Sequence, residues 1–459
     1  MKHSITILTL LITVVAQAQT IDKAYTTFKN NAVLKNATTA LYVVDCATKQ
    51  TLFEHNKELS VTPASTLKLL TTISALELLG SNYEIKTKLV FDSISHTLHL
   101  YPNYDPTWAS EYVAKDAFAN ALTTVIKNKK WNVTTLNVHT NTQDLQPTNT
   151  NWLWGDMGNY FGASPQSINW KDNKLTTYFN TTAAGDSAEL VKYAPKIDKL
   201  NITHTVLAST KSGDNTIAYS APNSYNVLIE GELPEHKNNY EVEISNPLVS
   251  NLFAQEMKQL LGIKTINFNN NKPMETPTNT AFITSPKLSE LVQKTNLHSL
   301  NLYAECLLKQ LAIQQKWGAK NTTILNELLN YWKIKLPTQA QGMDLQDACG
   351  LSPMNKVTAQ FQTQLLLHAH NANYYAALDN SLPVMAQSGS LKNMCKGTVA
   401  EGRISAKTGY IHGVRAYSGY VKTLSNKTLA FSFVVNNFTC SPAQVKQLME
   451  QVFVSMVMQ

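Results

Sequence analysis

The hydrophobic residues near the beginning of the chain indicate first a pair of strands and then a helix. A β-type run over 41–45 reaches a turn at 47–49 and resumes at 51–53, which predicts a β-hairpin. From Pro63 onward the apolar residues recur about every 3.6 positions, which predicts a helix that starts near Ser65 and ends at Leu79. We expect Gly80 to close this helix in a left-handed conformation.

The last third of the chain shows the same two periods in the reverse order. Helical spacing of the apolar residues predicts helices over 302–315 and 323–332. Three alternating runs and one further helical run follow, and they predict a three-stranded meander with a closing helix. These four segments cover residues 403–410, 414–422, 428–437 and 441–457.

The middle of the chain has a different pattern. Short alternating runs, separated by Asn, Thr and Pro, extend over about residues 85–268. Helical spacing is found there only locally, at 114–126 and 248–261. The Asn-rich segment 267–280, which contains two prolines, has the composition of a linker.

This change of pattern predicts the domain organisation. The chain has 459 residues, and single hydrophobic cores stop growing at about 250–300 residues, so we expect more than one core. Residues 19–85 and 281–459 are expected to form one discontinuous domain of mixed α/β (α+β) class. Residues 86–280 are then a β-rich insertion domain or domains.

Composition narrows the class of protein. A chain with 43% hydrophobic and 15% charged residues is neither disordered nor a multi-span membrane protein. The net charge of +7 comes almost entirely from Lys, since Arg403 and Arg415 are the only arginines. Because nucleic-acid-binding proteins usually contact phosphates and bases through Arg, we expect no nucleic-acid partner.

The first residues are typical of an export signal. Lys2 precedes an apolar run over 5–15 and the small-residue segment Ala16-Gln17-Ala18, which predicts cleavage after Ala18 and a periplasmic location. The run is shorter than the ~20 residues of a membrane span, and we expect no transmembrane segment in the mature chain. Five widely spaced cysteines without a Cys-x-x-Cys pair predict at most two disulfide bridges and no metal site.

One Ser-x-x-Lys sequence, Ser65-Thr66-Leu67-Lys68, lies at the start of the first helix. Residues three positions apart share a helix face, so the Lys68 amine can lie beside the Ser65 hydroxyl and accept its proton if burial lowers the amine's pKa. The helix N-terminus also favours negative charge near the Ser65 backbone N–H. The alternative is an N-capping serine followed by an exposed lysine.

Two further short motifs carry groups that could act with this serine. Lys407-Thr408-Gly409 lies in an alternating strand, where Lys and Thr could bind a terminal carboxylate and Gly409 lets a substrate backbone approach closely. Ser-x-Asn is found three times, at 167–169, 224–226 and 299–301. We favour Ser299 and Asn301 because they begin a predicted helix of the expected discontinuous domain, whereas the other two sequences lie in the expected insertion.

The order Ser-x-x-Lys, Ser-x-Asn, Lys-Thr-Gly is the signature of the penicillin-interacting serine enzymes. The chain more closely resembles the class C penicillin-binding proteins, the D-alanyl-D-alanine carboxypeptidases/endopeptidases of peptidase family S13. The matching segments include 63–80, 105–106, 156–163, 299–305 and 407–421. The resemblance implies a penicillin-binding/β-lactamase-like transpeptidase domain, with a five-stranded antiparallel sheet flanked by helices and interrupted by a large insertion.

The resemblance also implies a role for each matching residue. Ser65 would be the nucleophile and Lys68 its base, with Ser299 as proton relay and Asn301 holding the substrate carbonyl. The substrate-binding positions are expected to be those that bind the carboxylate, form the oxyanion hole with the Ser65 N–H or recognise the free amino group of the stem peptide. They are Lys407, Thr408, Gly409, Tyr410 and Asp156. No cofactor is implied.

Three positions depart from the family pattern. Tyr410 follows Lys-Thr-Gly where a small hydroxyl residue is usual, Leu300 stands where Asp is frequent, and Ala348-Cys349 interrupt an otherwise similar segment at 347–352. None of these changes removes a reacting group. We also consider Arg415, which begins the next strand, as a helper in carboxylate binding; the alternative is a surface arginine on a strand.

The sequence therefore predicts an exported serine peptidase that cleaves peptidoglycan stem peptides through a Ser65 acyl-enzyme and is acylated by β-lactam antibiotics. One alternative is a serine β-lactamase, which in class A uses a Glu in a Glu-x-x-Leu-Asn segment; Glu305, Glu327 and Glu401 lack Asn four residues later. A second is a noncatalytic peptidoglycan-binding protein. The balance of carboxypeptidase and endopeptidase action, the stem's diamino acid and the oligomeric state stay open.

Overall fold

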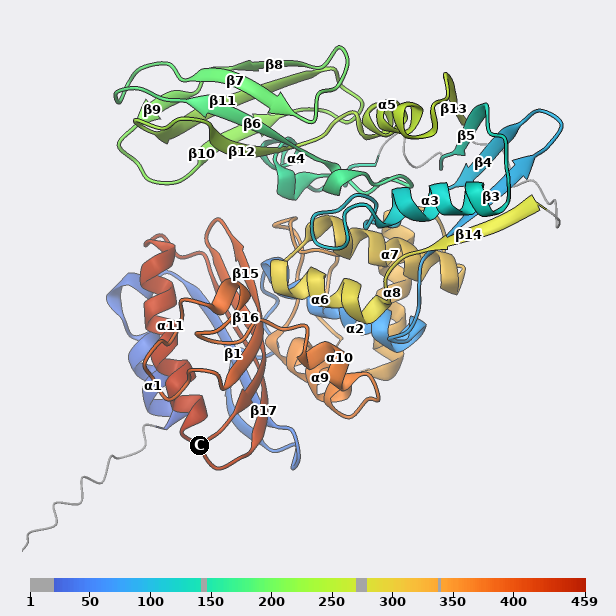
Figure 1. Cartoon of the computed structure of the whole chain (residues 1–459). Helices are drawn as coiled ribbons and strands as arrows, with labels where there is room; N and C mark the ends of the chain where they lie inside the picture. The colour runs from blue at the N-terminus through green and yellow to red at the C-terminus, as the bar shows by residue number, and fades with distance from the viewer. Residues whose placement is uncertain (1–19, 142–146, 270–278, 337–339) are drawn as a thin grey trace, which may run out of the picture.

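The computed structural model describes residues 20–141, 147–269, 279–336 and 340–459 (Figure 1). The expected export signal and the cleavage site after Ala18 lie outside these ranges, as does most of the expected linker. Residues 267–269 of that linker belong to a strand, which corrects the prediction for this part. Among the described residues, no helix combines the length and apolar character needed to cross a membrane.

A five-stranded antiparallel sheet brings the two ends of the chain together, as the blue and red strands of Figure 1 show. Its order is β15-β16-β17-β1-β2, and β1 pairs with β17 from Thr38 opposite Asn436 to Asp45 opposite Leu429. The strands are β1 (Thr38–Asp45), β2 (Thr51–His55), β15 (Ile404–Ile411), β16 (Val414–Lys422) and β17 (Thr428–Asn436). The predicted hairpin and meander are therefore confirmed.

Helices cover both faces of this sheet. Side chains alternate along β1, so that Leu41 and Val43 enter the core beneath the terminal helices, whereas Tyr42 and Val44 enter the core on the opposite face. The first face packs on α1 (Ile21–Lys29) and α11 (Pro442–Val457). The second packs on the helices α2 (Lys68–Leu79), α6 (Leu288–His298), α7 (Asn301–Gln315), α8 (Asn321–Lys335), α9 (Ala359–His370) and α10 (Tyr375–Asp379).

The helix predicted near Ser65 begins with a short 3-10 turn. This turn, η2, covers Ala64–Leu67 and leads directly into α2, so Ser65 lies in the turn and Lys68 is the first residue of the α-helix. Gly80 ends the helix with φ 83° and ψ 150°. The expected left-handed cap is therefore wrong, because Gly80 has a positive φ but an extended ψ.

The middle of the chain forms a second, β-rich part with a hydrophobic core of its own. It contains a five-stranded sheet, β13-β5-β4-β3-β14, a three-stranded sheet, β12-β6-β7, and a four-stranded sheet of β8 to β11. The strands are β3 (Lys86–Asp92), β4 (Thr97–Tyr101), β5 (Thr135–His139), β6 (Lys174–Asn180), β7 (Glu189–Ala194), β8 (Asn201–His204), β9 (Leu207–Ser209), β10 (Asn215–Tyr219), β11 (Asn226–Pro234), β12 (Tyr240–Ser245), β13 (Thr265–Asn269) and β14 (Thr280–Thr284).

Among the described residues of this part, three α-helices accompany the sheets: α3 (Ala117–Asn128), α4 (Trp154–Met157) and α5 (Val249–Leu261). The two longer helices match the local helical spacing at 114–126 and 248–261. Because β14 pairs with β3, the boundary expected after residue 280 falls inside a strand of this second part. Figure 1 shows α4 and the loops around it above the helices of the terminal part, and the candidate site lies between them.

Candidate active site

Two glycines allow the turn that carries Ser65 to lie close to its neighbours. A Cβ on Gly409 of β15 would come within 2.5 Å of the Pro63 carbonyl oxygen, and one on Gly350, which has φ 82°, would collide with the Ala64 carbonyl. Ala64 itself has a positive φ of 46°. Strand β15 and the 347–352 loop therefore hold Ser65 by backbone contact, which side chains at either glycine would prevent.

Lys68 lies fully buried beside this serine. Its Nζ is 2.9 Å from Ser65 Oγ, and it donates to Asn301 Oδ1 at 2.6 Å and to the Cys349 carbonyl at 2.7 Å. Burial lowers the pKa of Lys68, against the opposing charges of Cys349, Asp347 and Glu305. The neutral amine, which can accept a proton from Ser65, is therefore favoured more than in an exposed lysine.

The loop that supplies the Cys349 carbonyl is held by a buried carboxylate. Asp347 Oδ1 accepts from the Gly350 N–H at 2.7 Å and from Asn355 Nδ2 at 2.9 Å. Its Oδ2 accepts from the Ser352 N–H at 2.6 Å and from Trp152 Nε1 at 2.9 Å. The 347–352 segment, which departs from the family pattern, thus forms a turn that is held by hydrogen bonds. Asp347 thereby positions the Cys349 carbonyl against Lys68, a contact that the sequence analysis did not predict.

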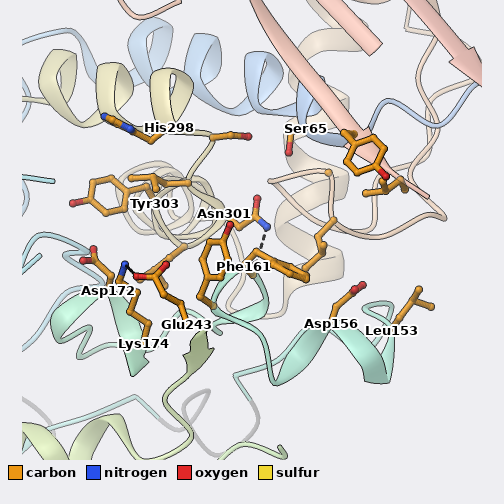
Figure 2. Close-up of a pocket in the computed structure, with 18 of the residues that line it drawn as sticks. Ser65, Leu153, Asp156, Phe161, Asp172, Lys174, Glu243, His298, Asn301 and Tyr303 are labelled. Atoms are coloured by element: carbon orange, nitrogen blue, oxygen red, sulfur yellow. Dashed lines mark hydrogen bonds and ion pairs between the residues drawn. The ribbon is translucent and has the colours of Figure 1, made fainter. Parts of the chain in front are cut away.

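The second motif is formed where two helices meet. Ser299 ends α6 in the left-handed conformation, with φ 60° and ψ 38°, and Asn301 begins α7. Asn301 Nδ2 also donates to the Phe161 carbonyl at 2.7 Å, the dashed contact in Figure 2. Asn301 therefore joins Lys68 to the η4 turn (Tyr160–Gly162) of the β-rich part.

The other two Ser-x-Asn sequences lie elsewhere. Ser167 and Asn169 are buried in the β-rich part, where the Asn169 amide bonds to Gln166. Ser224 precedes β11 and bonds to the Asn226 backbone. Of the three sequences, the one at 299–301 is the one that the structure brings to Ser65 and Lys68.

The third motif lies on β15 at the edge of the sheet. Lys407 is fully buried and donates to Ser299 Oγ at 2.9 Å and to the Thr408 carbonyl at 2.8 Å. Burial, with a further contribution from the charge of Lys68, holds the pKa of Lys407 well below its ordinary value. The Thr408 hydroxyl is 2.7 Å from Ser390 Oγ, a residue for which the sequence analysis found no signal.

Tyr410 and Arg415 pack on each other at the rim of the site. They are opposite in the β15–β16 pairing, and the guanidinium carbon of Arg415 is 4.9 Å from the centre of the Tyr410 ring and 5.9 Å from that of Tyr417. The Tyr410 side chain is 51% exposed and lines the cavity described next, whereas Arg415 does not. This place between two rings gives no support to a helper role for Arg415 in carboxylate binding.

A cavity of about 670 Å³ opens on Ser65 between the two parts of the chain (Figure 2). On one side of Asn301, Figure 2 shows Asp156 of α4 and Leu153, which directly precedes α4, along the cavity. Burial raises the pKa of the half-buried Asp156, and the Leu153 backbone partly offsets this effect. Beyond Ser299 the cavity continues past His298, Tyr303 and Asp172.

One group of side chains could bring metal-ligand atoms together in the described part of the chain. Glu305, Asp347 and Cys349 place one such atom each within 4.8 Å of one another, and all three residues are buried. The Asp347 oxygens already accept four hydrogen bonds, as described above. Glu305 accepts from the Ala348 N–H at 2.8 Å, and burial raises its pKa to about 7. These hydrogen bonds hold the loop behind Lys68 in place, which accounts for the close approach of the three side chains.

A serine and a buried lysine at a helix start, beside a Ser-x-Asn turn and a Lys-Thr-Gly strand, place the protein in the class of penicillin-interacting serine enzymes. The chain belongs to the D-Ala-D-Ala carboxypeptidase 3 (S13) family, which matches residues 19–456. The resemblance read from the motifs is therefore confirmed, and so is the serine-type D-Ala-D-Ala peptidase class.

Two relatives and one solved structure show how widely the likeness extends. The chain is 26% identical to a D-alanyl-D-alanine carboxypeptidase of Actinomadura sp. (strain R39), over 89% of this chain and 79% of the relative. It is 24% identical to a penicillin-sensitive carboxypeptidase A of Dictyostelium discoideum, over 88% and 83%. Penicillin binding protein 4 of Haemophilus influenzae shares the fold, with a TM-score of 0.75 and 16% identity over 92% of this chain and 97% of that one. The predicted fold class is confirmed.

Proposed function

We propose that this peptidase cleaves the D-Ala-D-Ala end of peptidoglycan stem peptides with Ser65 as its nucleophile and Lys68 as its general base. The observation that carries the proposal is the 2.9 Å contact between Ser65 Oγ and the fully buried Lys68 Nζ. A base of lowered pKa within hydrogen-bond distance of a hydroxyl is the arrangement that activates a serine.

In the proposed acylation step, Ser65 Oγ attacks the carbonyl carbon of the penultimate D-Ala while Lys68 takes the Ser65 proton. The backbone N–H groups of Ser65 and Tyr410 stabilise the oxyanion. Collapse of the intermediate breaks the C–N bond, and the leaving amine gains a proton through Ser299. Water then hydrolyses the ester and regenerates Ser65.

The remaining motif residues position the substrate. Asn301 presents its amide to the substrate carbonyl, since it already bonds Lys68 on the cavity side of α7. Lys407 and Thr408 bind the terminal carboxylate, whose negative charge would favour the protonated form of Lys407 against its burial. Asp156, which lines the cavity from α4, would pair with a free amino group of the stem, because an ammonium favours the ionised carboxylate.

The same site would be acylated by β-lactams. A second solved structure of the Haemophilus influenzae protein contains a bound β-lactam, and it shares the fold of this chain with a TM-score of 0.70. We further propose that the protein is exported to the periplasm, because its substrate lies outside the cytoplasm and its first residues are typical of an export signal.

The test is labelling of the mature protein with a tagged penicillin, together with an assay of D-Ala release from a stem pentapeptide. A stable adduct and D-Ala release are expected for the wild type, and both should be lost in Ser65→Ala. Ser299→Ala should lower D-Ala release, whereas Ser224→Ala serves as the matched control in another Ser-x-Asn sequence.

The alternatives give different results. Rapid loss of the penicillin adduct, with turnover of the antibiotic, would favour a β-lactamase. Binding of peptidoglycan with neither an adduct nor D-Ala release would favour a noncatalytic protein and contradict the proposal.

A further inference from the structure

Another cavity, of about 460 Å³, lies on the β-rich part, between α4 and the four-stranded sheet of β8 to β11. We call it the α4–β11 groove; its lining includes two aromatic rings together with hydroxyl, amide and carboxylate side chains. The members used below are Trp154, Thr203, Tyr219, Asn226, Leu228 and Glu230. These residues do not line the cavity at Ser65, so the groove is a separate surface.

The strand register places the groove on the outer face of the sheet. Tyr219 of β10 lies opposite Leu228 of β11, and Leu228 lies opposite Thr203 of β8, so these three side chains form one row. The neighbouring side chains of Ala218 and Val227 point to the other face and enter the core of the β-rich part. The row is therefore not needed for core packing and is available to a ligand.

The aromatic side chains of the groove lie together at the surface. Trp154 is 54% exposed, and its ring stacks on that of Tyr219 with the ring centres 6.1 Å apart and an interplanar angle of 28°. Exposed apolar groups that lie side by side, rather than singly, mark binding surfaces. The faces of such rings can pack on the C–H face of a sugar ring, and the exposed Thr203 and Asn226 offer a hydroxyl and an amide to its polar substituents.

The charge of the groove narrows the class of ligand. Among its described lining residues, Glu230 is the one that carries a charge at neutral pH. A nucleic acid or another anionic polymer would need Lys or Arg to neutralise it, and these lining residues include neither. An uncharged chain of N-acetylated sugars fits a wall of aromatic, hydroxyl and amide groups.

The segment that contains α4 joins the groove to the cavity at Ser65. Leu153 and Asp156 line the cavity, whereas Trp154 lines the groove. Gly158, which directly follows α4, lies so close to β10 that a Cβ there would collide with the Ala218 carbonyl. Helix α4 is therefore fixed beside β10, as Figure 1 shows, and the two sites keep a constant separation.

The proposed reaction brings a glycan to this place. The pairing of Asp156 with a stem amino group puts the acyl half of the peptide beside α4, and the far end of a stem peptide is attached to a sugar of the glycan strand. Trp154 lies two residues before Asp156, a separation of about 5 Å between Cα atoms in a helix. The sugar can therefore reach the groove while the peptide lies at Ser65.

We propose that the α4–β11 groove binds the glycan strand to which the stem peptide is attached, a chain of β-linked N-acetylated sugars, while the peptide occupies the cavity at Ser65. This inference rests on the proposed function of Ser65. Trp154 and Tyr219 form the platform on which a sugar ring packs. The enzyme therefore prefers stem peptides that remain attached to glycan over free peptides.

The test compares D-Ala release from a free stem pentapeptide with release from the same pentapeptide attached to a tetrasaccharide of the glycan strand. For the wild type we expect kcat/KM for the attached peptide to exceed that for the free peptide about tenfold. Trp154→Ala and Tyr219→Ala should each reduce this ratio about three- to fivefold, whereas Trp154→Phe, which keeps a ring, should retain most of it. The ratio divides out any change that α4 transmits to Asp156. Calorimetric titration with chitotetraose, which carries no peptide, should rank the variants in the same order.

Phe282→Ala is the matched control. Phe282 is 55% exposed on β14 of the same β-rich part and does not line the groove, so the variant should keep the wild-type ratio. A ratio near one for the wild type, even with chitotetraose bound, would overturn the inference and leave the proposed function standing. So would a change of oligomeric state in Trp154→Ala at an unchanged ratio, which would assign the groove to a contact between copies of the chain. Failure of the wild type to release D-Ala from either peptide would instead contradict the proposed function.

Discussion

Helix α2 carries an ionisable side chain near each end, and the surroundings disfavour the charged form of one and stabilise the charged form of the other. Lys68 at the first position is fully buried, and the side chain of Glu77 near the last turn is 14% exposed. Burial lowers the pKa of Lys68 and so disfavours its charge. Burial acts against the charge of Glu77 too, but hydrogen bonds more than offset it and lower the pKa of Glu77 to about 2.

The difference lies in the partners. Lys68 contacts a hydroxyl, an amide oxygen and a carbonyl, all of them neutral. Glu77 contacts four donors, two of which are basic groups. They are Tyr331, Lys335, His368 and Tyr374. Helix α2 can therefore hold a base of lowered pKa at one end and a carboxylate that stays ionised at neutral pH at the other, because charge-assisted hydrogen bonds are made to Glu77 and not to Lys68.

Replacement of Lys68 by Met should have the largest effect on activity. The side chain keeps its length but cannot accept the Ser65 proton, so D-Ala release should fall about 10²–10⁴-fold, the usual contribution of a general base. The free energy of unfolding should fall by only about 1–2 kcal/mol, since removal of a buried amine partly offsets the loss of the donor to Asn301 Oδ1 and the Cys349 carbonyl. Steady-state kinetics and urea unfolding measure the two effects; a large loss of stability with normal activity would break the comparison.

The same substitution at the other end should have the opposite effect. Glu77→Met leaves the donors of α8 and α9 without their carboxylate, and we expect the free energy of unfolding to fall by about 2–4 kcal/mol. D-Ala release measured well below the melting temperature should persist, because no contact of Glu77 reaches the cavity at Ser65. Equal stability of the two Met variants would show that the bonds to Glu77 contribute nothing net.

Acid should reduce the contribution of Glu77 to the free energy of unfolding. The pKa of Glu77 is about 4.5 when unfolded and about 2 when folded, so its stabilising effect is present above pH 4.5 and is lost as the pH falls toward 2. Over this window the wild type should lose about 1–2 kcal/mol more than Glu77→Gln, a value reduced for partial solvent access. Glu58→Gln, which changes an exposed carboxylate, should follow the wild type.

The side chains of this comparison were predictable from the sequence to different degrees. Ser65, Lys68, Ser299 and Lys407 could be chosen because each motif has a fixed spacing within one helix or strand, and the structure places them within hydrogen-bond distance of one another in pairs. The helices α2, α7, α8 and α11 were predictable from their 3.6-residue period, whereas α1, α6, α9 and α10 were not predicted. Glu77 gave no signal, because its four partners come from residues that are more than 250 positions away along the chain.

Backbone contacts were also invisible to sequence reasoning. The Cys349 and Phe161 carbonyls bond Lys68 and Asn301, but a carbonyl group is present at every position and carries no residue signature. Arg415 illustrates a related limit. Its place in the next strand suggested a ligand-binding role, yet pairing opposite Tyr410 directs its guanidinium onto aromatic rings.

The smallest expected effect tests what sets the protonation of Lys68. Glu305 lies behind the Cys349 loop, and its carboxylate raises the pKa of Lys68 against the dominant effect of burial. Glu305→Gln keeps an oxygen for the Ala348 N–H but removes the charge, so the pKa of Lys68 should fall further. The acidic limb of the kcat/KM profile for D-Ala release should then move to lower pH, by less than about one unit.

A purely structural role for Glu305 would lower the rate at every pH without moving that limb. Glu327→Gln, an exposed carboxylate on α8, is the control and should reproduce the wild-type profile. No change in either the rate or the position of the limb would mean that Glu305 is uncharged beside Lys68 and contributes nothing to the difference between the two ends of α2.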